Sequence, residues 1–200
     1  MKLSKKTILV LIPVLIAIII AGYFGFVQYS KNVKLNVTQK AETAKQDISS
    51  AFKGEKDGKK ISGEEKINIF KSSVTDLEKY ILINPNDKDA LLQIAAVYYN
   101  LGNYDKSISY YQKLIALEPD VAINYTNMAH AYLAAGKNDL AKENYQKSID
   151  MGLNNSVNYV GLSMILKEEG NIEEAKKVLE KGLEFNKNDS MIESFLEGIK

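Results

Sequence analysis

The side chains in this chain that could carry chemistry are few and isolated. His130 is the only histidine and there is no cysteine, which excludes a disulfide, a thiolate nucleophile and a thiolate metal site. A histidine serves as a metal ligand or general base when neighbouring groups orient it and tune its pKa. The sequence offers His130 no such neighbours, and it contains no catalytic motif and no glycine-rich phosphate loop after a strand. We therefore predict that the protein is not an enzyme and has no cofactor, metal or small-molecule substrate.

The charged residues argue against nucleic acid as a partner. All 26 basic residues are lysine, and 25 acidic residues leave a formal net charge of +1. This balance gives no general attraction to phosphate backbones. Because arginine is absent, the side chain best suited to bidentate recognition of phosphates and base edges is also missing.

The N-terminal region is different, because residues 7–30 carry no charge. From Ile8 to Val27 there is no strongly polar side chain either, and at about 1.5 Å per residue this run is roughly 30 Å long, one hydrocarbon thickness. Aromatic residues gather near its end, as they do at membrane interfaces: Tyr23, Phe24, Phe26 and Tyr29. We predict a basic tail over residues 1–6 and a transmembrane helix over residues 7–29 that contacts the lipid bilayer.

Two alternatives to this helix stay open. A cleavable signal peptide has an apolar core of about 7–15 residues, shorter than this one, and Ile19-Ile20-Ala21 is a poor cleavage site. A buried core helix is rarely apolar on every face over such a length. The lysines favour an orientation, since three of them crowd the first six residues while those after the span are spread out. We predict a single-pass protein of the cytoplasmic membrane, with the N-terminus inside and the remainder of the chain outside.

The C-terminal half repeats itself at an offset of 34 residues, which places Gly102 on Gly136 and then on Gly170. Seven further columns agree in size and polarity over three copies, which indicates internal duplication. They are Leu91, Tyr125 and Tyr159; Ile94, Met128 and Leu162; Ala95, Ala129 and Ser163; Tyr98, Tyr132 and Leu166; Ser107, Ala141 and Ala175; Tyr111, Tyr145 and Leu179; and Ile115, Ile149 and Leu183.

Each copy has the pattern of two amphipathic helices joined at its glycine. Apolar residues recur at helical spacing on both sides of the glycine, and the glycine can end the first helix in the left-handed conformation. The small residues of the Ala95 and Ser107 columns let the paired helices approach closely, and the tyrosine columns fill the space beside them. The aromatic columns are therefore interpreted as packing.

This pattern closely resembles the tetratricopeptide repeat, with copies over residues 88–121, 122–155 and 156–189. The departures are Leu153 and Lys187 where the family usually has proline, and Leu114, Ser148 and Gly182 where it usually has alanine. The resemblance implies an all-α fold, a right-handed superhelix of helix pairs called an α-solenoid. Residues 190–200 place Ile192, Phe195, Leu196 and Ile199 on one helix face, which predicts a C-terminal capping helix.

Residues 30–87 are predicted to form a helical linker and a degenerate first repeat. Apolar stripes from Val37 to Ala51 and from Ile67 to Ile81 indicate two facing helices. The residues between them, 53–63, are too polar to pack and are predicted to be a loop, and Ser62 with Glu65 forms a capping box for the second helix. The first helix can continue directly from the membrane span.

The resemblance implies a concave face, built by the first helix of each repeat, that binds a peptide or helix of a partner protein. The residues implied to line this groove are Leu92, Gln93, Ala96, Tyr99, Asn100, Thr126, Asn127, His130, Leu133, Val160, Met164 and Lys167. Some family members bind a C-terminal carboxylate with basic residues, but Leu92 and Ile123 or Thr126 stand at those places here. We predict a membrane-tethered interaction scaffold for envelope assembly or secretion; the alternative is a general holdase for unfolded exported proteins.

Overall fold

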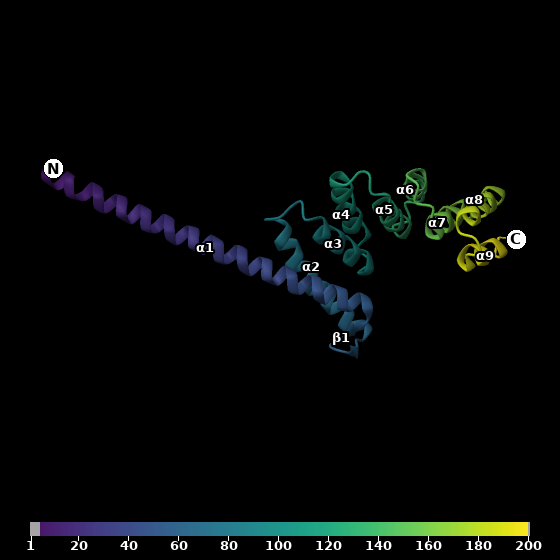
Figure 1. Ribbon diagram of the computed structural model, residues 1–200, viewed down its shortest axis with the longest axis horizontal. Coiled ribbons are helices and arrows are strands. Elements are labelled where there is room, and N and C mark those ends of the chain that lie inside the picture. Colours follow the sequence, from purple (N-terminus) through teal and green to yellow (C-terminus); the bar gives the residue numbers. More distant parts are fainter. Residues whose placement is uncertain (1–4, 200) are drawn as a thin grey trace.

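The computed structural model describes residues 5–199, with side chains from residue 18 onward. One long helix, α1 (Lys5–Lys53), projects from an array of shorter helices and leads into it (Figure 1). A small hairpin of β1 (Glu55–Lys56) and β2 (Lys59–Lys60) follows α1. The array continues with α2 (Gly63–Ile81), α3 (Lys88–Asn100), α4 (Tyr104–Leu117), α5 (Ala122–Ala134), α6 (Asn138–Asp150), α7 (Ser156–Glu168), α8 (Ile172–Phe185) and α9 (Ser190–Glu197).

The prediction of an array of stacked helix pairs is confirmed. Each helix packs on its neighbours in the chain, and α3, α5, α7 and α9 begin at residues 34 positions apart. Within the described part of the chain, no helix is long and apolar enough to cross a membrane. A transmembrane helix is predicted over residues 7–29. The side chains of its first residues, 7–17, lie outside the described part of the chain.

The segment predicted as a loop over residues 53–63 contains a hairpin instead. β1 and β2 pair antiparallel, with Glu55 opposite Lys60 and Lys56 opposite Lys59. Asp57 and Gly58 connect them with φ of 52° and 73°. Positive φ at both turn residues matches the twist of the strands, and Asp-Gly is a preferred pair for such a turn. Lys56 Nζ of β1 also donates to Asp47 of α1 at 2.8 Å, so local turn chemistry and a contact with α1 both favour the hairpin.

The glycines that join the helices of each pair act as predicted. Gly102, Gly136 and Gly170 have φ of 74°, 70° and 82°. At the first of them, the Asn103 N–H donates to the Tyr98 carbonyl at 2.9 Å and the Gly102 N–H donates to the Tyr99 carbonyl at 3.0 Å. These two bonds satisfy carbonyls that the end of α3 would otherwise leave unpaired. The chain therefore turns sharply after each first helix.

The C-terminal half of α1 is the first layer of the array. Its small and apolar side chains pack against α2 and α3, and the buried members are Ala41, Ala44, Ile48 and Ala51 from α1 and Phe70, Val74 and Leu77 from α2. Ser62 caps α2 by accepting a hydrogen bond from the Glu65 N–H at 3.1 Å, as predicted. α1 therefore continues without a break from the projecting segment into the array.

A cluster of charges fixes α1 to α3. Lys45 Nζ lies 3.0 Å from Asp89 and 3.5 Å from Asp87, which caps α3 by accepting from the Ala90 N–H. Tyr80 donates to Asp87 at 2.9 Å. Burial favours the neutral form of Asp87, but the hydrogen bonds from Ala90 and Tyr80 and the charge of Lys45 outweigh it and lower its pKa. α1 is therefore held to the array by partly buried ionic and polar contacts as well as by packing.

Close packing explains one departure from the family pattern, Gly182. A Cβ at this position would lie 2.9 Å from Cγ of Tyr159 and 3.0 Å from Cδ1 of Ile192. The side chains of α7 and α9 therefore occupy the space that alanine fills in the usual pattern. A similar contact occurs at Gly161, where a Cβ would lie 2.5 Å from Cζ of Tyr145.

A buried hydrogen-bond network joins α5, α6 and α7. Thr126 donates to Asn158 Oδ1 at 2.7 Å and lies 2.8 Å from the Ser148 hydroxyl. Asn158 Nδ2 donates to the Ser148 hydroxyl at 3.1 Å and to the Leu153 carbonyl at 2.8 Å. All three side chains are buried. Buried polar groups are stable only when they are paired, so each member depends on the others.

Substitution of Asn158 by alanine is expected to destabilise the array. The change removes both donors and one acceptor, and it leaves the Thr126 hydroxyl and the Leu153 carbonyl without these partners. We expect the free energy of unfolding to fall by about 1–3 kcal/mol, measured by urea unfolding. Asn68→Ala, an exposed position on α2, is the matched control and should change little. Equal stability of the two variants would contradict this account of the network.

Candidate functional site

The candidate site lies along the first helices of the repeats, where the predicted groove residues are distributed over α3, α5 and α7. Four of them come together at the end of the array nearest to α1, and they are Leu92, Gln93, Ala96 and Asn127. With residues of α1 and with Tyr111 they line an open hollow of about 600 Å³. We call this hollow the α1 hollow.

Residues of α1 form one wall of the α1 hollow, and the repeat pattern in the sequence did not predict them. Ile48, Ser49, Phe52 and Lys53 line this wall. Phe52 is 43% exposed and its ring lies 5.0 Å from that of Phe70, centroid to centroid, while Leu92 on the other side is 37% exposed. Exposed apolar side chains gathered in a hollow are typical of a binding site for apolar groups.

Gln93, which lines the α1 hollow, carries an unsatisfied acceptor. Its Nε2 donates to both carboxylate oxygens of Asp89 at 3.1 Å. Since a carboxylate can only accept, this contact fixes the orientation of the Gln93 amide. Its Oε1 is then buried without a hydrogen-bond partner. Such an atom gains free energy when a ligand supplies a donor, and a peptide N–H is one.

The other predicted groove residues are placed differently. Thr126 and Val160 are only 2% and 6% exposed, so their side chains belong to the packing between helices. Asn100 donates to the Ala96 carbonyl at 2.9 Å and Lys167 donates to the Gly198 carbonyl at 2.9 Å, which occupies both with the chain itself. The remaining three, Tyr99, Leu133 and Met164, are half-buried or exposed along the same face but lie outside the α1 hollow.

His130 is half-buried and faces Tyr145. Its Nδ1 lies 3.1 Å from the Tyr145 hydroxyl, and the two rings meet edge to face with centroids 5.4 Å apart. Burial raises the pKa of Tyr145, which keeps its hydroxyl protonated. Burial also lowers the pKa of His130, because the charged ring loses hydration. His130 is thus held as a neutral packing residue.

The lowered pKa of His130 makes the free energy of unfolding decrease as the pH falls. The unfolded chain takes up a proton on His130 as the pH falls through about 6.5, while the folded chain resists until the pH is lower. The His130 contribution to the free energy of unfolding is therefore constant above this value and falls below it. Urea unfolding at pH 7.5 and then at about pH 5 should show a larger loss for the unaltered protein than for His130→Gln. The same loss in both proteins would contradict the burial of this ring.

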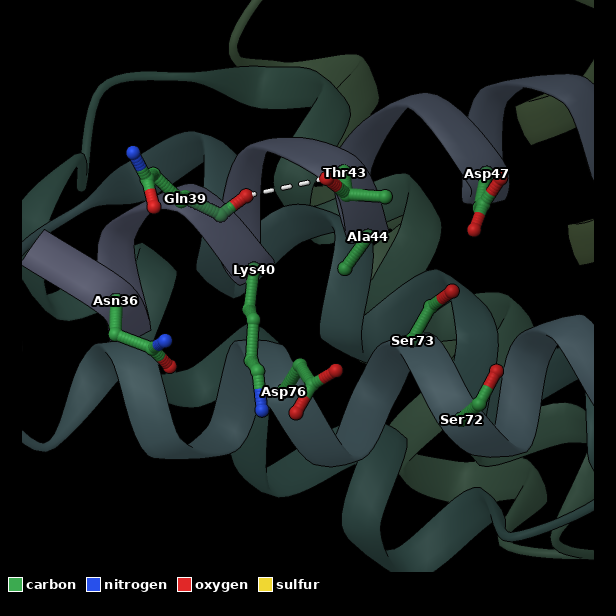
Figure 2. A pocket seen from close by; sticks show the side chains of 9 residues that line it. All are labelled: Asn36, Gln39, Lys40, Thr43, Ala44, Asp47, Ser72, Ser73 and Asp76. Atoms are coloured by element: carbon green, nitrogen blue, oxygen red, sulfur yellow. Dashed lines mark hydrogen bonds between the residues drawn. The ribbon is translucent and has the colours of Figure 1, made fainter.

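A second hollow, of about 230 Å³, lies between α1 and α2 and is polar. Figure 2 shows its nine lining residues: Asn36, Gln39, Lys40, Thr43, Ala44, Asp47, Ser72, Ser73 and Asp76. The Lys40 side chain extends to Asp76, and Thr43 donates to the Gln39 carbonyl at 3.2 Å. Among the described residues, no three histidine or acidic side chains are placed to hold a metal ion. The residues that line this hollow show which parts of α1 and α2 lie side by side.

Two models of the tetratricopeptide repeat match the chain, one over residues 89–154 and one over residues 158–189. A comparison with curated proteins found no match.

Solved structures of repeat proteins share the fold. The "MamA RS-1 ArsTM double mutant" is 14% identical with a TM-score of 0.63, over 80% of this chain and 83% of that one. TTC0263, a thermophilic TPR protein of Thermus thermophilus, is 18% identical with a TM-score of 0.53, over 66% and 74%. The first TPR of Spaghetti (RPAP3), bound to the HSP90 peptide SRMEEVD, is 25% identical with a TM-score of 0.52, over 56% and 89%.

Proposed function

We propose that the tetratricopeptide repeats over residues 89–154 and 158–189, together with α1, bind an uncharged, apolar segment of a partner protein. The observation that carries this proposal is the α1 hollow, where Phe52 and Leu92 expose apolar surface beside the unsatisfied Oε1 of Gln93. The apolar side chains bind apolar groups of the segment, and Gln93 accepts from one of its backbone N–H groups. The protein acts as an interaction module and not as an enzyme.

The small number of charges in the α1 hollow supports an uncharged ligand. Lys53 is the one charged side chain among the residues that line the hollow, and Asp89 nearby pairs with Lys45 at 3.0 Å. A repeat structure similar to this chain holds the peptide SRMEEVD, which is acidic. Here Leu92 and Ile123 or Thr126 stand where binding of a C-terminal carboxylate calls for lysine, so we do not propose such a ligand.

We further propose that residues 7–29 anchor the protein in the cytoplasmic membrane, with the N-terminus inside and the array outside. The charge-free run from Ile8 to Val27 and the lysines before it support this orientation. Over residues 18–29, the large apolar side chains exposed along α1 are Ile18, Ile19, Ile20, Tyr23, Phe24, Phe26 and Tyr29. This part of α1 projects from the array with no other element beside it (Figure 1). A bilayer would cover these side chains. We propose envelope assembly or secretion as the process that the protein serves.

Site-specific photo-crosslinking in cells tests the binding proposal. A photoreactive residue in place of Ser49, an exposed position in the α1 hollow, should capture a discrete partner in the full-length membrane protein. The same residue in place of Leu140, exposed on α6, is the control. Many unrelated products from Ser49 would instead favour the holdase. The same products from both positions, or none from Ser49, would refute binding in the hollow.

A further inference from the structure

The first five residues of the loop between α2 and α3, residues 82–86, expose apolar side chains that the fold does not require. Leu82 is 84% exposed and Ile83 is 42% exposed. Leu82 is the most exposed of the large apolar residues in the described part of the chain. A single exposed leucine needs no explanation, but two adjacent apolar residues at a protruding tip form a small apolar surface. We call residues 82–86 the tip loop.

The later repeats provide an internal comparison. At the offset of 34 residues, Leu82 corresponds to Ala116, Asp150 and Glu184. Asp87 is the one charged residue between α2 and α3, and the connection between α6 and α7, residues 151–155, contains none. The repeat fold therefore tolerates alanine or an acid at the place of Leu82. A large apolar residue at this place occurs in the first copy alone.

The position of the tip loop along α1 follows from the pairing of α1 with α2. The two helices run antiparallel, and Lys40 lies beside Asp76 in the polar hollow (Figure 2). Leu82 is six residues further along, about 9 Å at 1.5 Å per residue, which brings it level with residue 34. Figure 1 shows this loop pointing back along α1 toward the N-terminal end. The tip loop is thus on the side of the array that faces the proposed membrane anchor.

The distance from the bilayer is short. The proposed span ends near Tyr29, and residue 34 is about 8 Å beyond it along the helix. Packed helices are about 8–10 Å apart, so a helix tilt of about 20° toward the tip loop lowers it by roughly 3 Å. The lipid headgroup layer is about 5–7 Å thick on each side. A tilt in this direction would therefore bring the Leu82 and Ile83 side chains to this layer.

The charges near the tip loop are suited to an anionic lipid surface. Lys31 and Lys34 are exposed on α1 at the same level. The acidic groups close by are engaged, since Asp76 lies 3.3 Å from Lys79 and Asp87 lies 3.5 Å from Lys45. Apolar side chains flanked by lysines are typical of segments that lie in the membrane interface.

We propose that the tip loop, with Leu82 and Ile83, inserts into the headgroup layer of the membrane that holds α1. This second contact fixes how the array is tilted and rotated on the bilayer, and it rests on the proposed membrane anchor. Its occupant is the lipid interface, because the tip loop lies beside the start of the proposed anchor and the exposed Lys31 and Lys34 at this level suit an anionic lipid surface.

Fluorescence quenching in vesicles tests this contact. The chain has no cysteine, so Leu82→Cys, Asp150→Cys and Tyr23→Cys each accept one dye in the full-length protein. The vesicles contain equal parts of phosphatidylcholine and phosphatidylglycerol with nitroxide labels on the headgroups or on the acyl chains. We expect headgroup nitroxides to quench the dye at position 82 strongly and the dye at position 150 weakly. Acyl-chain nitroxides should quench the dye at position 23.

The outcomes separate the two proposals. If the dye at position 23 is not quenched, the membrane anchor is wrong and the tip contact is lost with it. If position 23 is quenched but position 82 is quenched no more than position 150, the anchor stands and the tip contact is refuted. The second result would mean that the tip loop faces water or another protein. A Leu82→Asp variant labelled at Ile83→Cys should lose the quenching if the apolar contact is responsible.

Discussion

Replacing both Ile18 and Ile19 by lysine is expected to release the protein from membranes. These residues lie at the middle of the proposed span and their side chains are exposed along α1. A lysine at the centre of a transmembrane helix costs about 2.5–3.5 kcal/mol, so the pair costs about 5–7 kcal/mol. The variant should appear in the soluble fraction after alkaline extraction and should not float with vesicles. Both substituted residues lie outside the packed array, so its fold should be unaffected.

The matched control for this change is Ile18→Leu with Ile19→Leu, which preserves the apolar character and should remain in the membrane. Two results would count against the anchor. One is a lysine variant that stays as firmly bound as its control. The other is an unaltered protein that alkaline extraction already removes.

Replacing Leu92 by aspartate is expected to abolish most of the binding in the α1 hollow. Leu92 is one of the two exposed apolar side chains in this hollow, and the new carboxylate replaces apolar surface by a charge that an uncharged segment does not pair. Loss of a central apolar anchor costs about 2 kcal/mol or more, roughly a 30-fold weaker affinity. The yield of the crosslink from Ser49 is the measurement.

Leu140→Asp is the control, because Leu140 is similarly exposed but lies on α6, away from the α1 hollow. It should leave the yield of the Ser49 crosslink unchanged. Thermal unfolding of both variants separates loss of binding from loss of fold. An undiminished crosslink in a folded Leu92→Asp protein would mean that partners bind elsewhere on the array.

The helices of the array were predictable because each copy buries the same positions. Equivalent residues such as Ala95 and Ala129, or Tyr111 and Tyr145, are buried in the same place in each copy. The same side-chain types therefore recur at the same offset. The glycine at Gly102 was predictable for a different reason, since a left-handed residue is needed wherever a first helix ends.

The hairpin after α1 was missed although its signal is present in the sequence. Asp57-Gly58 is a strong turn pair, but the flanking strands are two residues long and consist of lysine and glutamate. No alternation of apolar and polar residues marks them as strands. A loop was therefore the natural interpretation of a segment with so many charges.

The composition of the binding face could be predicted only in part. The family pattern identified Leu92 and Asn127, but not the contribution of Phe52, because the inserted hairpin breaks the 34-residue offset before α2. The burial of Thr126 depends on how closely α7 approaches α5, which Asn158 and Ser148 determine through their hydrogen bonds. Such contacts depend on side chains from three helices, and they produce no repeating pattern in the sequence from which they could be predicted.

The unbroken course of α1 makes the proposed anchor a rigid spacer. From Tyr29 to Phe52 the helix is about 35 Å long at 1.5 Å per residue, and no break lies between them. The proposed anchor would therefore hold the entrance of the α1 hollow at a set height above the lipid. A partner in the same membrane would then need a binding segment that reaches this height, whereas a freely diffusing partner would not.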